Sequence, residues 1–216
     1  MVVFDLSKQN SIASIFLSEV RDVSTQTDRM RFRKNLNRLG EILSYEMSKR
    51  LAYESVPIST PLSDIKQPKL KEQPVLIPIM RAAMPFFEGV QNFFDQADCG
   101  FVGAYRAPEF DQNKQVQSDY LAVPDLSDKI VILIDPMLAT GHSFVTTMEK
   151  LKQYGSPKEF ILLSLIAAPE GIKYIEEEVA GEISLWCVAI DEKLNDKAYI
   201  VPGLGDAGDL AYGLKM

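Results

Sequence analysis

Residues 130–143 have the sequence IVILIDPMLATGHS, in which a run of apolar residues leads directly into an acidic residue, a proline and a turn of small residues. Apolar residues then recur at helical spacing at Phe144, Met148 and Leu151. This order predicts a buried strand over 130–134, a short turn and a helix that runs to about Tyr154. The first amides of a helix lack intrahelical partners and lie at the positive end of its dipole, so such a turn is typical of a phosphate site.

Polar groups in this turn make the expected ligand more specific. Thr140 and Ser143 offer hydroxyl donors, and Gly141 allows the backbone to approach a ligand closely. Asp135 lies at the carboxyl end of the strand, where its carboxylate can accept hydrogen bonds from sugar hydroxyl groups. The turn therefore predicts a site for ribose 5-phosphate. His142 could assist the phosphate, but a histidine at a helix start is more typical of a solvent-facing residue.

Two other phosphate motifs fit the sequence less well. A Walker motif requires a lysine directly after its last glycine, and His142 occupies that position. The dinucleotide pattern G-x-G-x-x-G occurs over residues 203–208, but the segment 209–216 is too short for the helix and second strand that this fold requires. We interpret residues 200–209 as a glycine-rich loop whose backbone donors and acceptors can read a small planar heterocycle. A plain terminal turn is the alternative.

The composition limits the possible classes of protein. The 216 residues, of which 46% are hydrophobic, suffice for one α/β domain with a sizeable core. The formal net charge of −7 argues against a general nucleic-acid or anionic membrane surface. Cys99 and Cys187 form no C-x-x-C motif, and we expect a reduced, cytoplasmic protein without a signal peptide or a membrane-spanning segment. Since His142 is the single histidine, zinc sites with two histidines and Ser-His-Asp triads elsewhere are excluded.

The rest of the chain alternates between helical and strand patterns. Residues 10–53 are expected to be helical, and the prolines within 54–74 favour short edge strands or an extended connection. The helical part has one apolar face at Ile12, Ile15, Phe16 and Val20, and another at Phe32, Leu36, Leu39, Ile42, Leu43 and Met47. Strands are predicted over 75–79, 100–105, 160–166 and 183–190, and helices over 82–94 and 171–179. Buried strands separated by helices indicate an α/β fold whose parallel sheet binds ligands at the carboxyl ends of its strands.

Two arginines follow predicted strands and are candidates for anion binding. Arg81 is expected in the first turn of the helix after strand 75–79, where a cation opposes the helix dipole unless an anion is nearby. Arg106 follows the strand at 100–105 and opens a polar stretch over 107–118 of the kind that forms active-site lids. An exposed surface arginine and a solvated surface loop are the alternative interpretations.

Taken together, these segments resemble the uracil phosphoribosyltransferase family. The likeness rests on DPMLATGHS at 135–143, AAPEGI at 167–172 and YIVPGLGDAGD at 199–209, supported by VLIPIMRA at 75–82 and VGAYR at 102–106. The resemblance implies a type I phosphoribosyltransferase fold, with a parallel sheet flanked by helices, a small hood over the base and a helical N-terminal segment. Residues 10–53 would form the helical segment, 75–190 the α/β core and 191–216 the base-binding segment of a single domain.

The resemblance also implies an activity and a site. The reaction would transfer the phosphoribosyl group of 5-phosphoribosyl 1-pyrophosphate (PRPP) to uracil, giving UMP and pyrophosphate in pyrimidine salvage. Mg²⁺ would be held mostly by the oxygens of the substrate, and the only macromolecular partner would be the same chain, as a homodimer or higher homo-oligomer. PRPP would be bound by Arg81, Arg106, Asp135, Pro136, Met137, Leu138, Ala139, Thr140, Gly141, His142, Ser143 and Asp206, of which Arg106, Asp135 and Asp206 would act in catalysis. Uracil would be bound by Ile200, Gly205, Asp206 and Ala207, largely through backbone atoms.

The sequence departs from the family pattern at Ala83, Ala107, His142 and Leu210, where most members have a glycine, an acidic residue, a glycine and an arginine. These departures bear on affinity, loop closure and allosteric control more than on the class of reaction. Two alternatives to the uracil enzyme stay open: a non-catalytic regulator that senses pyrimidine nucleotides on the same fold, and a phosphoribosyltransferase for another base.

Overall fold

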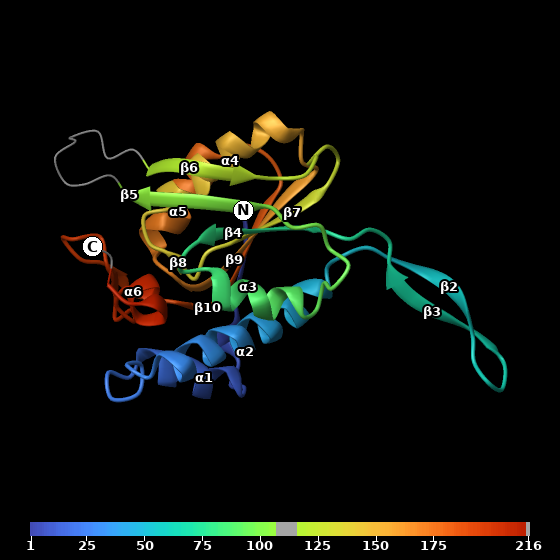
Figure 1. The fold of residues 1–216 in the computed structure, drawn as a ribbon, viewed down its shortest axis with the longest axis horizontal. Coiled ribbons are helices and arrows are strands. Elements are labelled where there is room, and N and C mark those ends of the chain that lie inside the picture. The colour runs from blue at the N-terminus through green and yellow to red at the C-terminus, as the bar shows by residue number, and fades with distance from the viewer. Residues whose placement is uncertain (107–115, 215–216) are drawn as a thin grey trace.

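The centre of the structure is one mostly parallel sheet (Figure 1). The structure is a computed structural model that describes residues 1–106 and 116–214, with side chains described outside 104–119. The strands follow the order β1-β10-β9-β7-β4-β5-β6, and all neighbours on this path are parallel except β5 and β6. Their bounds are β1 Val2–Asp5, β4 Val75–Met80, β5 Phe101–Arg106, β6 Val116–Ala122, β7 Ile130–Ile134, β9 Glu159–Ala167 and β10 Ile183–Ile190, and a short β8 (Met137–Leu138) also pairs with β9. The predicted α/β fold with a parallel sheet is confirmed.

Helices cover both faces of this sheet (Figure 1). One face carries α1 (Ala13–Arg21), α2 (Arg29–Ser48), α3 (Met84–Gln91) and α6 (Ala207–Tyr212), and the other carries α4 (His142–Leu151) and α5 (Pro169–Glu178). Strand β7 shows why both layers are needed, because Ile132 packs in the first core and its neighbours Val131 and Leu133 pack in the second. A central parallel strand is buried on both faces, so its sequence is continuously apolar.

Helices α2 and α3 touch through their backbones. A Cβ atom on Gly40 would lie 2.3 Å from the Phe86 carbonyl oxygen, and one on Gly89 would lie 2.0 Å from the Asn37 carbonyl oxygen. Only glycine fits at either position, since no other side chain allows helices to approach so closely. This contact fixes α3, which follows directly from the end of β4, against the long helix α2.

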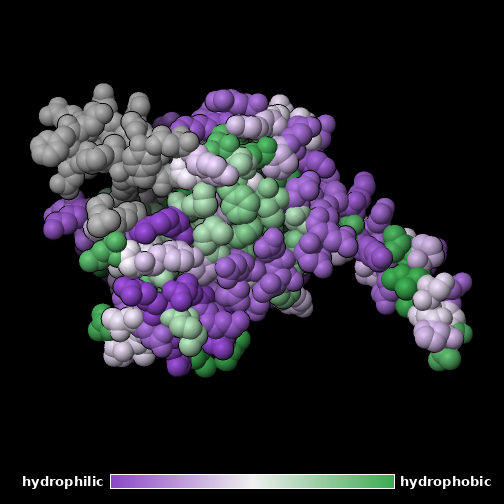
Figure 2. Space-filling view, in the orientation of Figure 1, coloured by the Kyte–Doolittle hydropathy of each residue, from purple (hydrophilic) through white to green (hydrophobic). Residues whose placement is uncertain are grey.

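A hairpin of β2 (Tyr53–Ser59) and β3 (Asp64–Leu70) projects from the body of the molecule (Figure 1). It is the proline-containing segment that was expected to form short strands, and its two strands pair with each other rather than with the central sheet. Figure 2 shows hydrophobic residues on it among hydrophilic ones, and Leu62 is 96% exposed.

Three expectations about the elements were wrong or incomplete. The segment 10–53 is not one helical region, because α1 and α2 are separated by turns and the chain enters β2 at Tyr53. Ile12 and Ile15 do not belong to a buried face, as they are 57% and 54% exposed, and Ala13 and Val20 are buried instead. Strands β1 and β6 were not predicted. Strand β1 pairs with the distant strand β10, whereas β6 pairs with the preceding strand β5, and the polar stretch expected over 107–118 enters β6 at Val116.

The carboxylate of Glu19 ties α1 to α2. It accepts hydrogen bonds from Arg31 Nε at 2.9 Å and from Asn35 Nδ2 at 2.6 Å, in addition to its ion pair with Arg31 Nη2. These bonds, the one from Arg31 first, lower the pKa of Glu19 from 4.5 to about 2. A carboxyl whose pKa is lowered by folding stabilises the folded state fully above its unfolded pKa, and this contribution is lost as the pH falls through the folded value.

We therefore expect Glu19→Gln to lower the thermal midpoint of unfolding at pH 6 and to matter progressively less between about pH 4.5 and pH 2. Thermal unfolding of both proteins across that range measures the effect as the gap between their midpoints. A gap that stays constant down to pH 2 would contradict the assigned cause.

Candidate active site

The carboxyl ends of the parallel strands meet at one edge of the sheet, where α/β proteins bind ligands. Arg81 follows β4, Asp135 follows β7 and Asp191 follows β10. The segment after β9 leads into α5 at Pro169. Candidate residues that are far apart in the sequence are therefore gathered at this edge.

The turn 135–143 is held in shape by the neighbouring strand β9. The Asp135 N–H donates to the Leu163 carbonyl oxygen at 3.1 Å, and the Pro136 carbonyl oxygen accepts from the Leu165 and Ile166 N–H groups at 3.0 and 3.1 Å. Within the turn, the Met137 N–H donates to Asp135 Oδ1 at 3.2 Å. This local bond fixes the aspartate relative to the turn that follows it.

Gly141 connects the turn to α4. Its φ of +83° lies in the left-handed region, and a Cβ atom there would be 2.9 Å from the Gly171 carbonyl oxygen and 3.1 Å from the Tyr174 ring. Gly141 is the N-cap residue of α4 and, as a glycine, has no side chain to cap it, and Thr140 and Ser143 flank it. The first amides of this helix are therefore available to an anion, as the sequence predicts for a phosphate site.

The segment AAPEGI at 167–172 packs against the turn 135–143. Gly171 lies against the Ala139 carbonyl oxygen, which would be 2.2 Å from a Cβ atom on Gly171. The ring of His142 stacks on Tyr174 at a centroid distance of 4.4 Å, and His142 is otherwise exposed, as expected of a solvent-facing residue. Glu170 accepts a hydrogen bond from the Leu194 N–H at 2.9 Å, which lowers the pKa of Glu170 and links α5 to the C-terminal segment.

Arg81 lies in a turn before α3 rather than in the first turn of a helix, so that prediction was wrong. The helix begins at Met84, beside Pro85, because a proline in the first helical turn loses no hydrogen bond there. Arg81 is exposed, and its Nη2 lies 3.3 Å from Asp209 Oδ1 and 3.5 Å from the Gly213 carbonyl oxygen. The cation thus already lies at the C-terminal segment, next to a carboxylate that a more negative ligand could replace.

The C-terminal segment brings the expected base-binding residues to the same edge. It consists of β11 (Lys193–Leu194), β12 (Ile200–Val201), a loop and α6. Gly205 and Asp206 are exposed, whereas Ile200 and Ala207 are buried. A Cβ atom on Gly208 would lie 3.2 Å from Asp206 Oδ1 and 3.9 Å from Arg81 Nη2, so the structure brings Arg81 and Asp206 together.

Asp206 also caps α6, since its Oδ1 accepts from the Asp209 N–H at 2.9 Å.

Arg106 ends β5, next to β4 in the sheet, and its side chain lies outside the described residues, as do Ala107 and the rest of the expected lid up to residue 115. Within the described ranges, no group of three or more His, Cys, Asp or Glu residues is placed to hold a metal ion.

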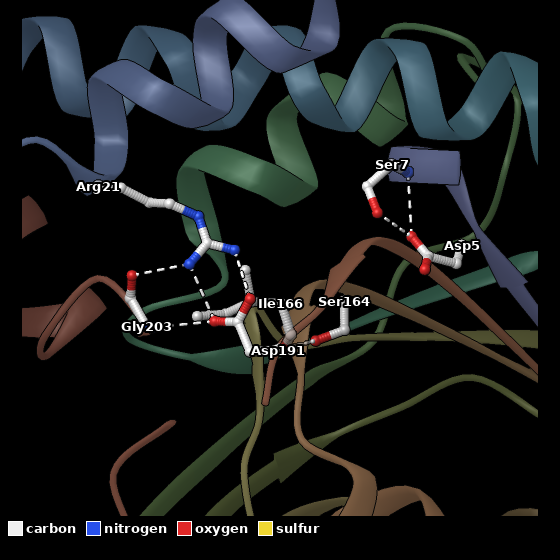
Figure 3. Close-up of polar contacts among 7 residues, drawn as sticks. All are labelled: Asp5, Ser7, Arg21, Ser164, Ile166, Asp191 and Gly203. Atoms are coloured by element: carbon white, nitrogen blue, oxygen red, sulfur yellow. Dashed lines mark hydrogen bonds and ion pairs between the residues drawn. The ribbon is translucent and has the colours of Figure 1, made fainter. Parts of the chain in front are cut away.

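Sequence reasoning missed two charged residues at this edge, Arg21 and Asp191 (Figure 3). Asp191 follows the apolar strand β10 directly, in the position that Asp135 has after β7. An acidic residue directly after an apolar strand was therefore a sequence signal that could have identified Asp191. Arg21, at the end of α1, carried no such signal, because its partner is distant in the sequence.

Comparison with known proteins places this geometry in a family. The model of the family described as uracil phosphoribosyltransferase matches residues 7–213. The chain belongs to the uracil phosphoribosyltransferase family. This membership confirms the predicted enzyme class, a pentosyltransferase, and does not favour the alternative of a non-catalytic regulator.

Relatives of this family are similar over most of their length. A uracil phosphoribosyltransferase from Porphyromonas gingivalis is 40% identical over 216 residues, which is all of both chains. One from Pyrococcus furiosus is 40% identical over 202 residues, covering 91% of this chain and 84% of that one. A solved protein structure from Aquifex aeolicus, 33% identical, covers all of both chains with a TM-score of 0.88.

A more distant structure supports the fold alone. A hypoxanthine phosphoribosyltransferase from Staphylococcus aureus is 13% identical and matches with a TM-score of 0.50 over 75% of this chain and 76% of that one. The type I phosphoribosyltransferase fold that the resemblance implied is therefore confirmed, independently of which base each enzyme uses.

Proposed function

We propose that this member of the family transfers the phosphoribosyl group of PRPP to N1 of uracil, giving UMP and pyrophosphate. The observation that carries the proposal is the uncapped start of α4, which lies beside Asp135 at the edge where Arg81 and the loop after β12 meet. An anion bound there is next to a carboxylate for the ribose, a cation for the diphosphate and a glycine-rich backbone for the base.

Each part of PRPP is assigned to a different segment. The 5-phosphate is bound by the turn Asp135–Ser143 through backbone amides and the hydroxyl groups of Thr140 and Ser143, and the Asp135 carboxylate accepts from the ribose hydroxyls. Arg81 and Arg106 bind the diphosphate. Uracil is read mainly by backbone groups of Ile200, Gly205 and Ala207, and Asp206 faces the sugar.

The chemistry assigned to these residues is electrostatic. The bond from C1′ to the diphosphate oxygen breaks early, so positive charge develops on the ribose and negative charge on the leaving diphosphate. Fixed cations aimed at the leaving group stabilise that charge more in the transition state than in the ground state. Arg81 is suited to this because its guanidinium exchanges one carboxylate, Asp209, for a more highly charged diphosphate.

Mg²⁺ fits this site as a cation that arrives with the substrate. Mg²⁺ is usually bound through one or two carboxylates together with substrate phosphates rather than by an all-protein cage. Asp135 and Asp206 supply carboxylates at this edge, and the described residues contain no group of three or more His, Cys, Asp or Glu that could hold the ion by itself. When bound, the ion would neutralise charge on the diphosphate.

We also propose a homodimer or higher homo-oligomer in the cytoplasm. Exposed apolar residues on α1 and on the projecting hairpin support self-association, and the unpaired Cys99 and Cys187 are typical of a reducing compartment. Over the described parts of the chain, none of the helices combines the length and apolar character needed to cross a membrane.

The test is an assay of a panel of bases with PRPP and Mg²⁺. We expect UMP formation from uracil with kcat/KM about 100-fold or more above that for cytosine, because cytosine inverts the donor and acceptor at positions 3 and 4, and the site's buried polar groups would be left unpaired. Product analysis by chromatography measures each rate. Comparable rates with both bases, or preference for a purine, would favour a phosphoribosyltransferase for another base.

A further inference from the structure

A partly buried ion pair joins the last residue of α1 to the residue after β10 (Figure 3). Arg21 Nη2 donates to Asp191 Oδ1 at 2.6 Å and Nη1 donates to Oδ2 at 2.9 Å, which makes the pair bidentate. The side chains of Arg21 and Asp191 are 21% and 4% exposed. The Asp191 N–H donates to the Ala167 carbonyl oxygen at 2.8 Å, so the carboxylate is fixed to the carboxyl edge of the sheet.

The same two side chains hold both backbone polar groups of Gly203. The Gly203 N–H donates to Asp191 Oδ2 at 2.9 Å, and Arg21 Nη1 donates to the Gly203 carbonyl oxygen at 2.9 Å. The Glu192 N–H adds a bond to the Val201 carbonyl oxygen at 3.0 Å. Gly203 therefore cannot change its orientation without breaking a charge-assisted hydrogen bond.

Gly203 is a buried residue in the middle of the loop 200–207, which we call the base loop. After it, Leu204 is buried, Gly205 and Asp206 are exposed, and Ala207 begins α6. The backbone around Gly205 is thus fixed on one side by the ion pair and on the other by the helix. Asp191 and Arg21 can therefore determine the orientation of the backbone N–H and carbonyl groups around Gly205.

We propose that Arg21 and Asp191 are positioning residues for the base: they orient the base loop so that its backbone groups match the hydrogen-bonding edge of uracil. The proposal rests on the proposed function, in which this loop reads the base. Recognition through backbone atoms requires a backbone that is held within a fraction of an ångström before the ligand arrives. Neither side chain contacts the substrate, and both act through Gly203.

The test compares Michaelis constants for the two substrates in the full-length protein. Asp191→Asn removes the carboxylate charge and cannot accept from Arg21 and Gly203 as the carboxylate does. We expect the KM for uracil to rise about tenfold or more and the KM for PRPP to stay within about twofold, with weaker discrimination against cytosine. Arg21→Lys keeps the positive charge but loses the planar guanidinium group that makes the bidentate contact. We therefore expect a smaller rise in the KM for uracil, again with little change in the KM for PRPP.

The chain offers a matched control. Arg50 Nη2, from the turn after α2, pairs with Glu159 Oε1 at 2.5 Å, at the amino end of β9. The side chains are 34% and 10% exposed, so this pair is also partly buried. Glu159→Gln removes this ion pair and is expected to leave both KM values near those of the wild type.

The outcomes separate this inference from the proposed function. A wild-type protein that makes no UMP from uracil would overturn both. If the wild type makes UMP and both KM values rise together in the variants, or neither rises, the ion pair is structural only and the inference alone is overturned. Should Asp191→Asn fail to fold, the split measured for Arg21→Lys decides the question.

Discussion

Replacing Gly141 by alanine is expected to lower kcat/KM for PRPP about 100-fold. The added methyl group would lie 2.9 Å from the Gly171 carbonyl oxygen and 3.1 Å from the ring of Tyr174, so the turn must move away from α5. A displacement of about 1 Å in a group that positions substrate suffices for a loss of this size. Steady-state kinetics at varied PRPP measures it.

Gly181→Ala is the control for this experiment. Gly181 also has a positive φ, +121°, but a Cβ atom there would have no heavy atom within 4 Å. Both substitutions therefore strain the backbone and lower stability, whereas only Gly141→Ala displaces the turn. Equal effects on PRPP kinetics in the two variants would show that the phosphate does not bind at the start of α4.

Arg81→Ala is expected to reduce kcat by about 100- to 1000-fold, the range found when one donor to a developing charge is removed. Arg81→Lys should recover part of the loss, because it restores the charge without the guanidinium fork. Single-turnover measurements with saturating PRPP would separate the chemical step from binding.

Arg33→Ala is the matched control. Like Arg81, Arg33 reaches the C-terminal segment, where its Nη1 donates to the Ala211 carbonyl oxygen at 2.8 Å, but it comes from α2 rather than from the site. An arginine that merely supports α6 would have the same effect at either position. A similar loss in both variants would therefore contradict the role of Arg81 at the diphosphate.

The strand, turn and helix over 130–151 could be predicted from the sequence because each part has a local cause. Strand β7 is buried on both faces, so its five residues are all apolar, and the apolar spacing of Phe144, Met148 and Leu151 matches the buried side of α4. The glycines of the loop 200–207 were also visible in the sequence, and the positive φ angles of Gly203 and Gly205 (+63° and +93°) are a local reason for glycine at these positions.

Features that depend on distant partners could not be predicted. Strand β1 is four residues long and owes its place to pairing with β10. Arg21 and Asp191 lie 170 positions apart, so no window of sequence shows that they pair. Ile12 and Ile15 illustrate a second reason why burial could not be predicted. Helical spacing identifies an apolar stripe, but it does not say which residues of that stripe the core covers, and these two are exposed.

The backbone contact between α2 and α3 limits how the segment around Arg81 can move. The turn that carries Arg81 leads straight into α3, and α3 cannot slide along α2 while Gly40 and Gly89 lie against opposing carbonyl groups. If Arg81 binds the diphosphate as proposed, the ligand would therefore meet a guanidinium whose main chain is already held in place by this helix pair.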